Sequence, residues 1–185
     1  MRIIGGAWRR RSLLAPASYH IRPTADRARE TLFSILDNAR NYSDWPLENA
    51  TVLDIFAGTG ALGLEALSRG AGRAVFIDDN ARSIATVRRN IRALAATDRT
   101  TVLQRDATQP GPSITSASLV FVDPPYRLGL AEKAIAAFAA TGWFSSGALV
   151  IVEAAVTEPI IPPGEFTLLE TRDCGSAKFW FMSYP

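Results

Sequence analysis

Asp123-Pro124-Pro125-Tyr126 directly follows the apolar run Ser118–Val122, and its residue types suit chemistry on a planar amino group. Pro124 keeps Asp123 out of the α region, and the two prolines fix φ at about −65°. The Asp123 carboxylate and the Pro124 carbonyl are therefore two acceptors held in one relative orientation. Accepting both N–H bonds of a nucleobase amine favours a pyramidal nitrogen whose lone pair faces an electrophile, while Tyr126 offers the base a flat surface.

The same four residues also have a purely structural interpretation. Proline is common where a strand turns, and Asp123 can cap a following helix. Because four residues form a short motif, the choice between the two interpretations depends on the rest of the chain.

A glycine-rich turn predicts a second ligand site. The apolar run 50–56 leads into Gly58-x-Gly60-x-x-Gly63, and a helical pattern continues to Gly70. This spacing satisfies the dinucleotide fingerprint, so an NAD enzyme has to be considered. Asp54 argues against it, because a carboxylate repels a pyrophosphate and attracts the ammonium of a methionine-like group. S-adenosylmethionine has such an ammonium and no phosphate.

Acidic residues recur where the predicted strands end. Asp78 and Asp79 follow the run 74–77, and an acid there can accept both ribose hydroxyls; Asp106 follows the run 101–104 and can accept from an adenine amine. With Asp54 and Asp123, four successive strands end in acids at the edge where parallel sheets bind ligands. The predicted cofactor contacts are Asp54, Phe56, Ala57, Gly58, Gly60, Asp78, Asp79, Asp106 and Ala107.

Length and composition indicate a single compact domain over residues 1–185, with an extension over 1–40 and a core over 41–185. One Cys and one His exclude an internal disulfide and make a Cys/His zinc site implausible, so no metal is expected. Cys174, beside Gly175, is interpreted as a turn residue. Without an eighteen-residue apolar run or a signal-peptide pattern, we expect a soluble cytoplasmic protein and no membrane partner.

The arginines gather at the N-terminus. Residues 1–29 carry a charge of +6, whereas residues 30–185 carry −4. Residues 2–11, with Gly5-Gly6 inside them, resemble a small hairpin that places Trp8 among arginines, a composition suited to RNA. A solvated face in an arginine-rich chain is the alternative. The predicted RNA contacts are Arg2, Trp8, Arg9, Arg10, Arg11, Arg22 and Arg27.

The remaining patterns complete an α/β fold. Thr24 is predicted to cap a helix that buries Ala28, Leu32, Ile35 and Leu36, and a further helix is expected over 130–140. Trp143 and Phe144 are interpreted as core residues, and 41–48 as a loop. A fifth strand over 148–152 ends at Glu153, and the runs 166–171 and 177–182 predict an antiparallel hairpin. The result is a seven-stranded, mostly parallel sheet. The role of His20 stays open between a structural connection and the rim of the substrate pocket.

Three blocks of the chain resemble the bacterial small-subunit (16S) rRNA guanine-N2 methyltransferases of the RsmD family. They are Arg2–Gly6 with Trp8-Arg9 and Arg22–Phe33; Asp54 with Phe56–Arg69; and Phe121–Tyr126 with Gly129. Asp78 departs from the family, which often has Glu there. The resemblance implies a Rossmann-like class I fold with a short basic N-terminal β-hairpin. It also implies methyl transfer from S-adenosyl-L-methionine to the exocyclic amine of one guanine of small-subunit ribosomal RNA, in an assembling particle. We expect a monomer.

Two other functions share part of this pattern. A DNA adenine-N6 methyltransferase uses Asp-Pro-Pro-Tyr, but this chain lacks an obvious inserted target-recognition domain. A non-catalytic RNA-binding or assembly module is a further alternative, although a pure binder has no need for acids at four strand ends.

Overall fold

The structure is a computed structural model that describes residues 1–15, 23–37, 45 and 47–185. His20, Arg22 and most of the predicted loop over 41–48 lie outside these residues. The elements are η1 (Gly6–Trp8), α1 (Pro23–Asp37), β1 (Thr51–Ile55), α2 (Ala61–Ser68), β2 (Arg73–Asp78), α3 (Ala81–Ala93), η2 (Thr97–Arg99), β3 (Thr100–Gln104), β4 (Ala117–Val122), α4 (Leu130–Ala140), β5 (Phe144–Ala155), β6 (Thr167–Cys174) and β7 (Ala177–Ser183).

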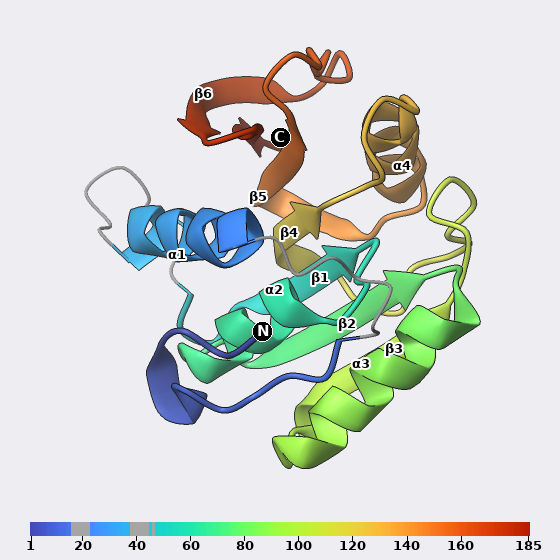
Figure 1. Cartoon of the computed structure of the whole chain (residues 1–185). Helices are drawn as coiled ribbons and strands as arrows, with labels where there is room; N and C mark the ends of the chain where they lie inside the picture. The colour runs from blue at the N-terminus through green and yellow to red at the C-terminus, as the bar shows by residue number, and fades with distance from the viewer. Residues whose placement is uncertain (16–22, 38–44, 46) are drawn as a thin grey trace.

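The strands form one seven-stranded sheet in the order β3-β2-β1-β4-β5-β7-β6 (Figure 1). β1 to β5 pair in parallel, and β7 runs antiparallel to both β5 and β6. The mostly parallel sheet with a C-terminal hairpin is thus confirmed. The strand order reverses between β1 and β4, and open α/β sheets bind their ligands at this point, beyond the carboxyl ends of the strands.

Two apolar layers cover the sheet, because alternate residues of each central strand face opposite sides. Val52 of β1 belongs to a core with α1, α2 and α3, whereas its neighbour Leu53 belongs to a core with α4. Trp143 and Phe144 are buried, so their interpretation as core residues is confirmed. Among the described residues, no helix is long and apolar enough to cross a membrane.

The N-terminal segment, here called the arm (residues 1–15), is only partly the hairpin that the sequence predicts. Its two sides run antiparallel, with Ile3 N donating to Arg11 O at 2.9 Å, but their only ladder pair is the isolated bridge between Arg2 and Ser12. Gly6 begins a 3₁₀ turn rather than a tight glycine turn. A Cβ on Gly6 would lie 1.8 Å from Ser68 O, so the glycine serves the close approach of the arm to α2.

A buried carboxylate fastens the arm to α2. Glu65 accepts hydrogen bonds from Ile4 N at 2.8 Å and Gly5 N at 2.7 Å, and from Arg69 Nε at 2.8 Å. The buried guanidinium of Arg29 lies 3.8 Å from the same carboxylate. Every carboxylate oxygen therefore has a donor, which burial of a charge requires.

α1 begins two residues earlier than a cap at Thr24 allows. Pro23 is its first residue, so Thr24 lies inside the helix and the prediction of Thr24 as its cap is wrong. Proline suits the first helical position because its fixed φ is helical and its missing N–H would have no partner there. The predicted core face is present, with Ala28, Leu32 and Leu36 buried.

α3 and the two 3₁₀ turns have no counterpart among the predicted elements, and two further differences concern the strands. β5 starts at Phe144 and is twelve residues long, because its pairing continues through an irregularity in register between Ala117 and Leu119 of β4. Cys174 is the last residue of β6, paired with Ala177, rather than a turn residue. Its side chain lies 3.5 Å from the Thr31 hydroxyl of α1, which explains a small, half-buried residue at this position.

Candidate functional site

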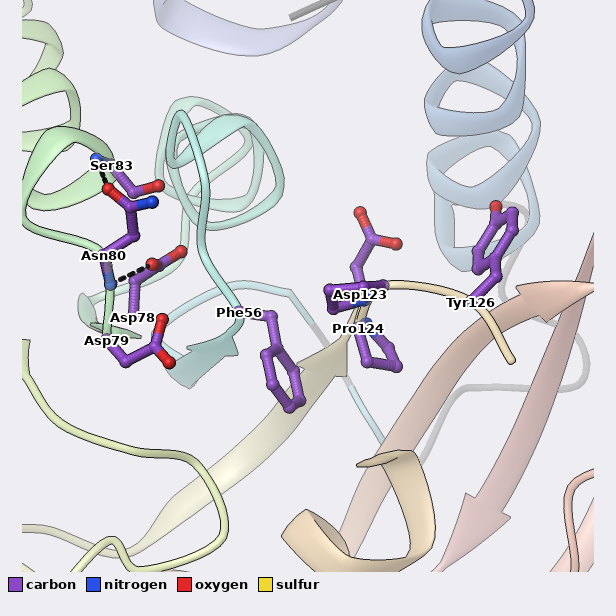
Figure 2. Close-up of a pocket in the computed structure, with 9 residues that line it drawn as sticks. Phe56, Asp78, Asp79, Asn80, Ser83, Asp123, Pro124 and Tyr126 are labelled. Atoms are coloured by element: carbon purple, nitrogen blue, oxygen red, sulfur yellow. Dashed lines mark hydrogen bonds between the residues drawn. The ribbon is translucent and has the colours of Figure 1, made fainter. Parts of the chain in front are cut away.

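A pocket of about 430 Å³ opens at the carboxyl ends of β1, β2 and β4 (Figure 2). Its volume lies in the range of small-molecule sites. The lining residues are Phe56, Asp78, Asp79, Asn80, Ser83, Asp123, Pro124, Pro125 and Tyr126. The structure thus brings the predicted base-binding motif and the Asp78-Asp79 pair to one opening, from elements far apart in the sequence.

The glycine turn between β1 and α2 has the backbone that its glycines predict. Gly58 and Gly60 have φ values of 55° and 77°, in the left-handed region. A Cβ on Gly63 would lie 2.5 Å from the Phe76 ring, so this glycine allows α2 to pack closely on β2. Phe56 has a φ of 63°, a costly conformation for an aromatic residue, and its ring faces the pocket (Figure 2).

Asp78 holds two segments of the pocket wall together through hydrogen bonds. Its carboxylate accepts from Gly58 N at 2.8 Å and from Asn80 N at 2.9 Å, which joins the glycine turn to the start of α3. Asp79 is exposed next to it. The two acids therefore differ: Asp78 fixes the loop geometry, and Asp79 offers a free-standing carboxylate to the opening.

Asp54 is a nearly isolated buried carboxylate. It is 1 % exposed and accepts from Gly63 N at 2.9 Å. Burial raises its pKa to about 7, the Gly63 hydrogen bond opposes this rise, and Asp78 adds to it. Asp54 does not line the pocket itself, so its charge acts from just beneath the surface.

Asp123 stands on the other side of the pocket. It follows β4, and its backbone N–H donates to Ile55 O at 3.3 Å, which holds the motif against β1. Burial raises its pKa well above the usual range, and the charges of Glu153 and Asp54 raise it further. Among the described residues, no side chain or backbone group donates a hydrogen bond to its carboxylate. The carboxylate is thus open to a donor from outside.

Tyr126 is held by Glu153 of β5, which the sequence indicates only as the end of a strand. Its hydroxyl donates to Glu153 Oε1 at 2.8 Å. Burial raises the pKa of Glu153, and this hydrogen bond lowers it in part. Two adjacent acids with raised pKa values are typical of functional sites.

Several predicted cofactor contacts do not reach this pocket. Asp106 is exposed and accepts from the backbone and hydroxyl of Thr108, which lowers its pKa. Ala107 is buried in the core beside α4. Ala57, Gly58 and Gly60 form the buried wall of the glycine turn.

Three residues in or beside the pocket are absent from the predicted site: Asn80, Ser83 and Glu153. Asn80 caps α3 through Arg82 N at 2.8 Å and lines the pocket with Ser83; an Asn before a helical pattern signals such a cap. Glu153 follows a predicted strand, as the four named acids do, but no sequence pattern indicates its contact with Tyr126, 27 residues away.

The predicted RNA contacts separate into two groups. Arg2, Arg9, Arg10 and Arg27 line a groove of about 520 Å³ between the arm and α1, together with Asp26 and Glu30. Arg11 points elsewhere and donates to Ala93 O at the end of α3, at 2.6 Å.

Trp8 is half-buried against the core, with the guanidinium of Arg99 5.1 Å from its ring centroid. Its arginine neighbour thus comes from η2 and not from the arm. Within the described residues, no group of three or more His, Cys, Asp or Glu side chains could hold a metal ion.

Comparisons with known proteins agree on one family. The family described as conserved hypothetical protein 95 matches residues 1–183. Ribosomal RNA small subunit methyltransferase D of Escherichia coli (strain K12) is 40% identical over 164 residues, covering 88% of this chain and 79% of the relative.

Solved structures share the fold. The Escherichia coli protein yhhF has a TM-score of 0.83 at 36% identity, over 100% of this chain and 97% of its own. The Thermus thermophilus 16S rRNA N2 G1207 methyltransferase, solved with AdoMet and guanosine, has a TM-score of 0.67 at 18% identity, over 91% of this chain and 45% of its own. The second likeness concerns the fold alone.

Proposed function

The chain belongs to the conserved hypothetical protein 95 family, with the small-subunit ribosomal RNA methyltransferase D of Escherichia coli among its relatives, and on this basis we propose that it methylates small-subunit ribosomal RNA. The methyl donor is S-adenosyl-L-methionine, and the acceptor is the exocyclic N2 of a guanine. The observation that carries the proposal is the open Asp123 carboxylate, which shares one pocket with Tyr126 and with Asp78 and Asp79.

The residues around the glycine turn fit the proposed donor. S-adenosyl-L-methionine supplies an electrophilic methyl group on a sulfonium. Asp54 attracts its ammonium, because a buried carboxylate with a single described donor gains most from a cation. Asp79 can accept from ribose hydroxyls, and Asp78 keeps Gly58 and Asn80 in place around them. A pyrophosphate would meet three carboxylates here, which disfavours NAD.

The residues on the side of the methyl acceptor suit an amine. Asp123 and the Pro124 carbonyl accept the two N–H bonds of guanine N2, and Tyr126 stacks on the base after it has left any helix. Asp123 takes the proton once the nitrogen has become cationic. Much of the rate gain comes from holding nitrogen and methyl about 3–3.5 Å apart in line.

The groove between the arm and α1 is the proposed contact with the RNA backbone. Arg2, Arg9, Arg10 and Arg27 place four guanidinium groups around it, and guanidinium groups suit phosphate oxygens. Trp8 is also proposed to contact the RNA, as is Arg22, which lies outside the described residues. We also propose that the protein acts as a monomer on an assembling ribosomal particle in the cytoplasm.

Nucleoside mapping by mass spectrometry tests the function. Small-subunit particles and naked rRNA from cells lacking the gene are incubated with the protein and labelled S-adenosyl-L-methionine, and we expect label in N2-methylguanosine. Label in N6-methyladenine of added DNA would instead support the DNA methyltransferase alternative. No label in any substrate, with intact RNA binding, would support the assembly-module alternative.

A further inference from the structure

Glu153 and Asp123 occupy equivalent places on neighbouring strands. β4 and β5 pair in parallel with Val122 opposite Val152, and each acid is the next residue along its strand. This register brings a second carboxyl to the side of the proposed base-binding residue. β7 presents the uncharged ring of Phe179 opposite Glu153.

The chain around Glu153 also contacts the turn formed by residues 123–127, here called the elbow, which contains Tyr126. Glu153 accepts the Tyr126 hydroxyl at 2.8 Å, and both oxygens of Glu158 accept from Arg127 N, at 2.8 and 2.9 Å. Arg127 has a φ of 65°, so the turn after Tyr126 is a costly conformation that the Glu158 contact stabilises. The ring is thus fixed at its hydroxyl and through the backbone that follows it.

The carboxyl groups of Asp123 and Glu153 also interact electrostatically. Both have pKa values raised by burial, and the charge of Glu153 raises the pKa of Asp123. Asp54 of β1 is the other acid that acts on Asp123. α1, the blue helix beside Tyr126 in Figure 2, carries Asp26, which is paired with Arg29 at 3.0 Å. Neutralising Glu153 therefore favours ionisation of Asp123.

We propose that Glu153 is a positioning residue for methyl transfer, which fixes the ring of Tyr126 through its hydroxyl and sets the pH at which Asp123 accepts a proton. The inference rests on the proposed function. It assigns two separable effects to one carboxylate: an acceptor that orients an aromatic ring, and a charge that acts on the neighbouring acid.

Three variants separate these effects, assayed by label transfer to small-subunit particles from pH 5 to pH 9. Glu153→Gln keeps an acceptor oxygen and removes the charge, so we expect KM for the particle to stay within about twofold and the acid limb of the kcat/KM profile to move to lower pH. Tyr126→Phe removes the hydroxyl and keeps the ring. It should lower kcat/KM about ten- to a hundredfold and leave the acid limb near its wild-type position, because a misplaced partner costs rate.

Glu153→Ala removes both acceptor and charge, so it should combine the two results. Glu132→Gln is the matched control, because Glu132 contacts Ile161 N outside the pocket. Its profile should equal that of the wild type. Thermal unfolding of each variant reports whether the fold is kept, and Glu153→Gln and Tyr126→Phe decide the matter if Glu153→Ala does not fold.

An acid limb that stays in place in Glu153→Gln would overturn the charge effect. A kcat/KM within twofold of wild type in Tyr126→Phe would overturn the positioning effect. Failure of the proposed function looks different, since the wild-type protein itself would then label no nucleoside, which would overturn the inference as well, or a nucleoside other than N2-methylguanosine. The comparison of variants would still be made on that product.

Discussion

Two sites in the molecule bury carboxylates in opposite ways. At the junction of the arm and α2, Glu65 is fully buried and receives three hydrogen bonds, from Ile4, Gly5 and Arg69. At the strand-edge pocket, Asp54 receives one bond, and Asp123 receives none from the described residues. The first site uses a charge to hold two segments together. The second leaves charges unsatisfied, which costs stability and prepares them for a ligand.

Substitution at the junction should have the largest effect on stability. Glu65→Ala leaves two backbone N–H groups and Arg69 Nε without their acceptor and removes the charge beside the buried Arg29, so we expect a loss of about 3–5 kcal/mol in the free energy of unfolding. Urea denaturation measures it. Asp123→Asn, a conservative change at the pocket, is the control and should lose almost nothing. Equal losses in both variants would remove the distinction between the two sites.

Substitution in the pocket should have its largest effect on rate. Asp123→Ala removes a preorganised acceptor for the amine, so we expect methylation to slow by about 100- to 1,000-fold. Isothermal calorimetry should find the affinity for S-adenosyl-L-methionine nearly unchanged, because the partner of Asp123 is the base. Wild-type turnover in this variant would mean that the motif is a structural turn.

Asp54 should make the ligand-free protein less stable as the pH rises. Its folded pKa of about 7 lies above the ordinary value of 3.8, so the folded state keeps the proton longer than the unfolded state. The free energy of unfolding therefore falls as the pH rises from about 4 to about 7 and levels off above, at up to about 1.4 kcal/mol per pH unit.

Asp54→Asn should remove much of this pH dependence. We expect the variant to gain on the order of 2 kcal/mol at pH 8 and to bind S-adenosyl-L-methionine more weakly, since the attraction for the ammonium is lost. Thermal unfolding at pH 5 and pH 8 and calorimetry measure the two effects. A variant that loses stability at pH 8 would show that the Asp54 charge is as well satisfied as that of Glu65.

The smallest effect is expected on the surface of the arm. Arg9→Ala with Arg10→Ala should flatten the dependence of log K on log salt for rRNA binding by about 1.4 to 1.8, at roughly 0.7–0.9 for each lost phosphate contact. Arg11→Ala is the matched control, because Arg11 binds the end of α3. If Arg11→Ala flattens the slope as much as the double variant, the groove between the arm and α1 is not the RNA contact.

Local patterns determined much of the fold. The first four strand runs, the glycine turn and the helix over 130–140 are present nearly at the predicted bounds, because burial on both faces makes parallel strands continuously apolar and Gly58 and Gly60 need positive φ. β5 extends beyond the predicted 148–152 at both ends. The turn at Asp123–Tyr126 could also be predicted from the sequence, since two prolines fix its backbone whatever surrounds it.

Only the tertiary structure decided which charges meet. The seven arginines of residues 1–29 look alike in sequence, yet Arg29 is buried beside Glu65, and Arg11 binds α3, while Arg9 and Arg10 face a groove. Glu65 contacts Ile4 across 61 residues, and Glu153 reaches Tyr126 across 27. The sequence by itself determined most of the elements and the edge where ligands bind, because these follow from short-range periodicity and backbone restriction. The partner of each buried charge depends on how the elements pack, and no short-range pattern records that.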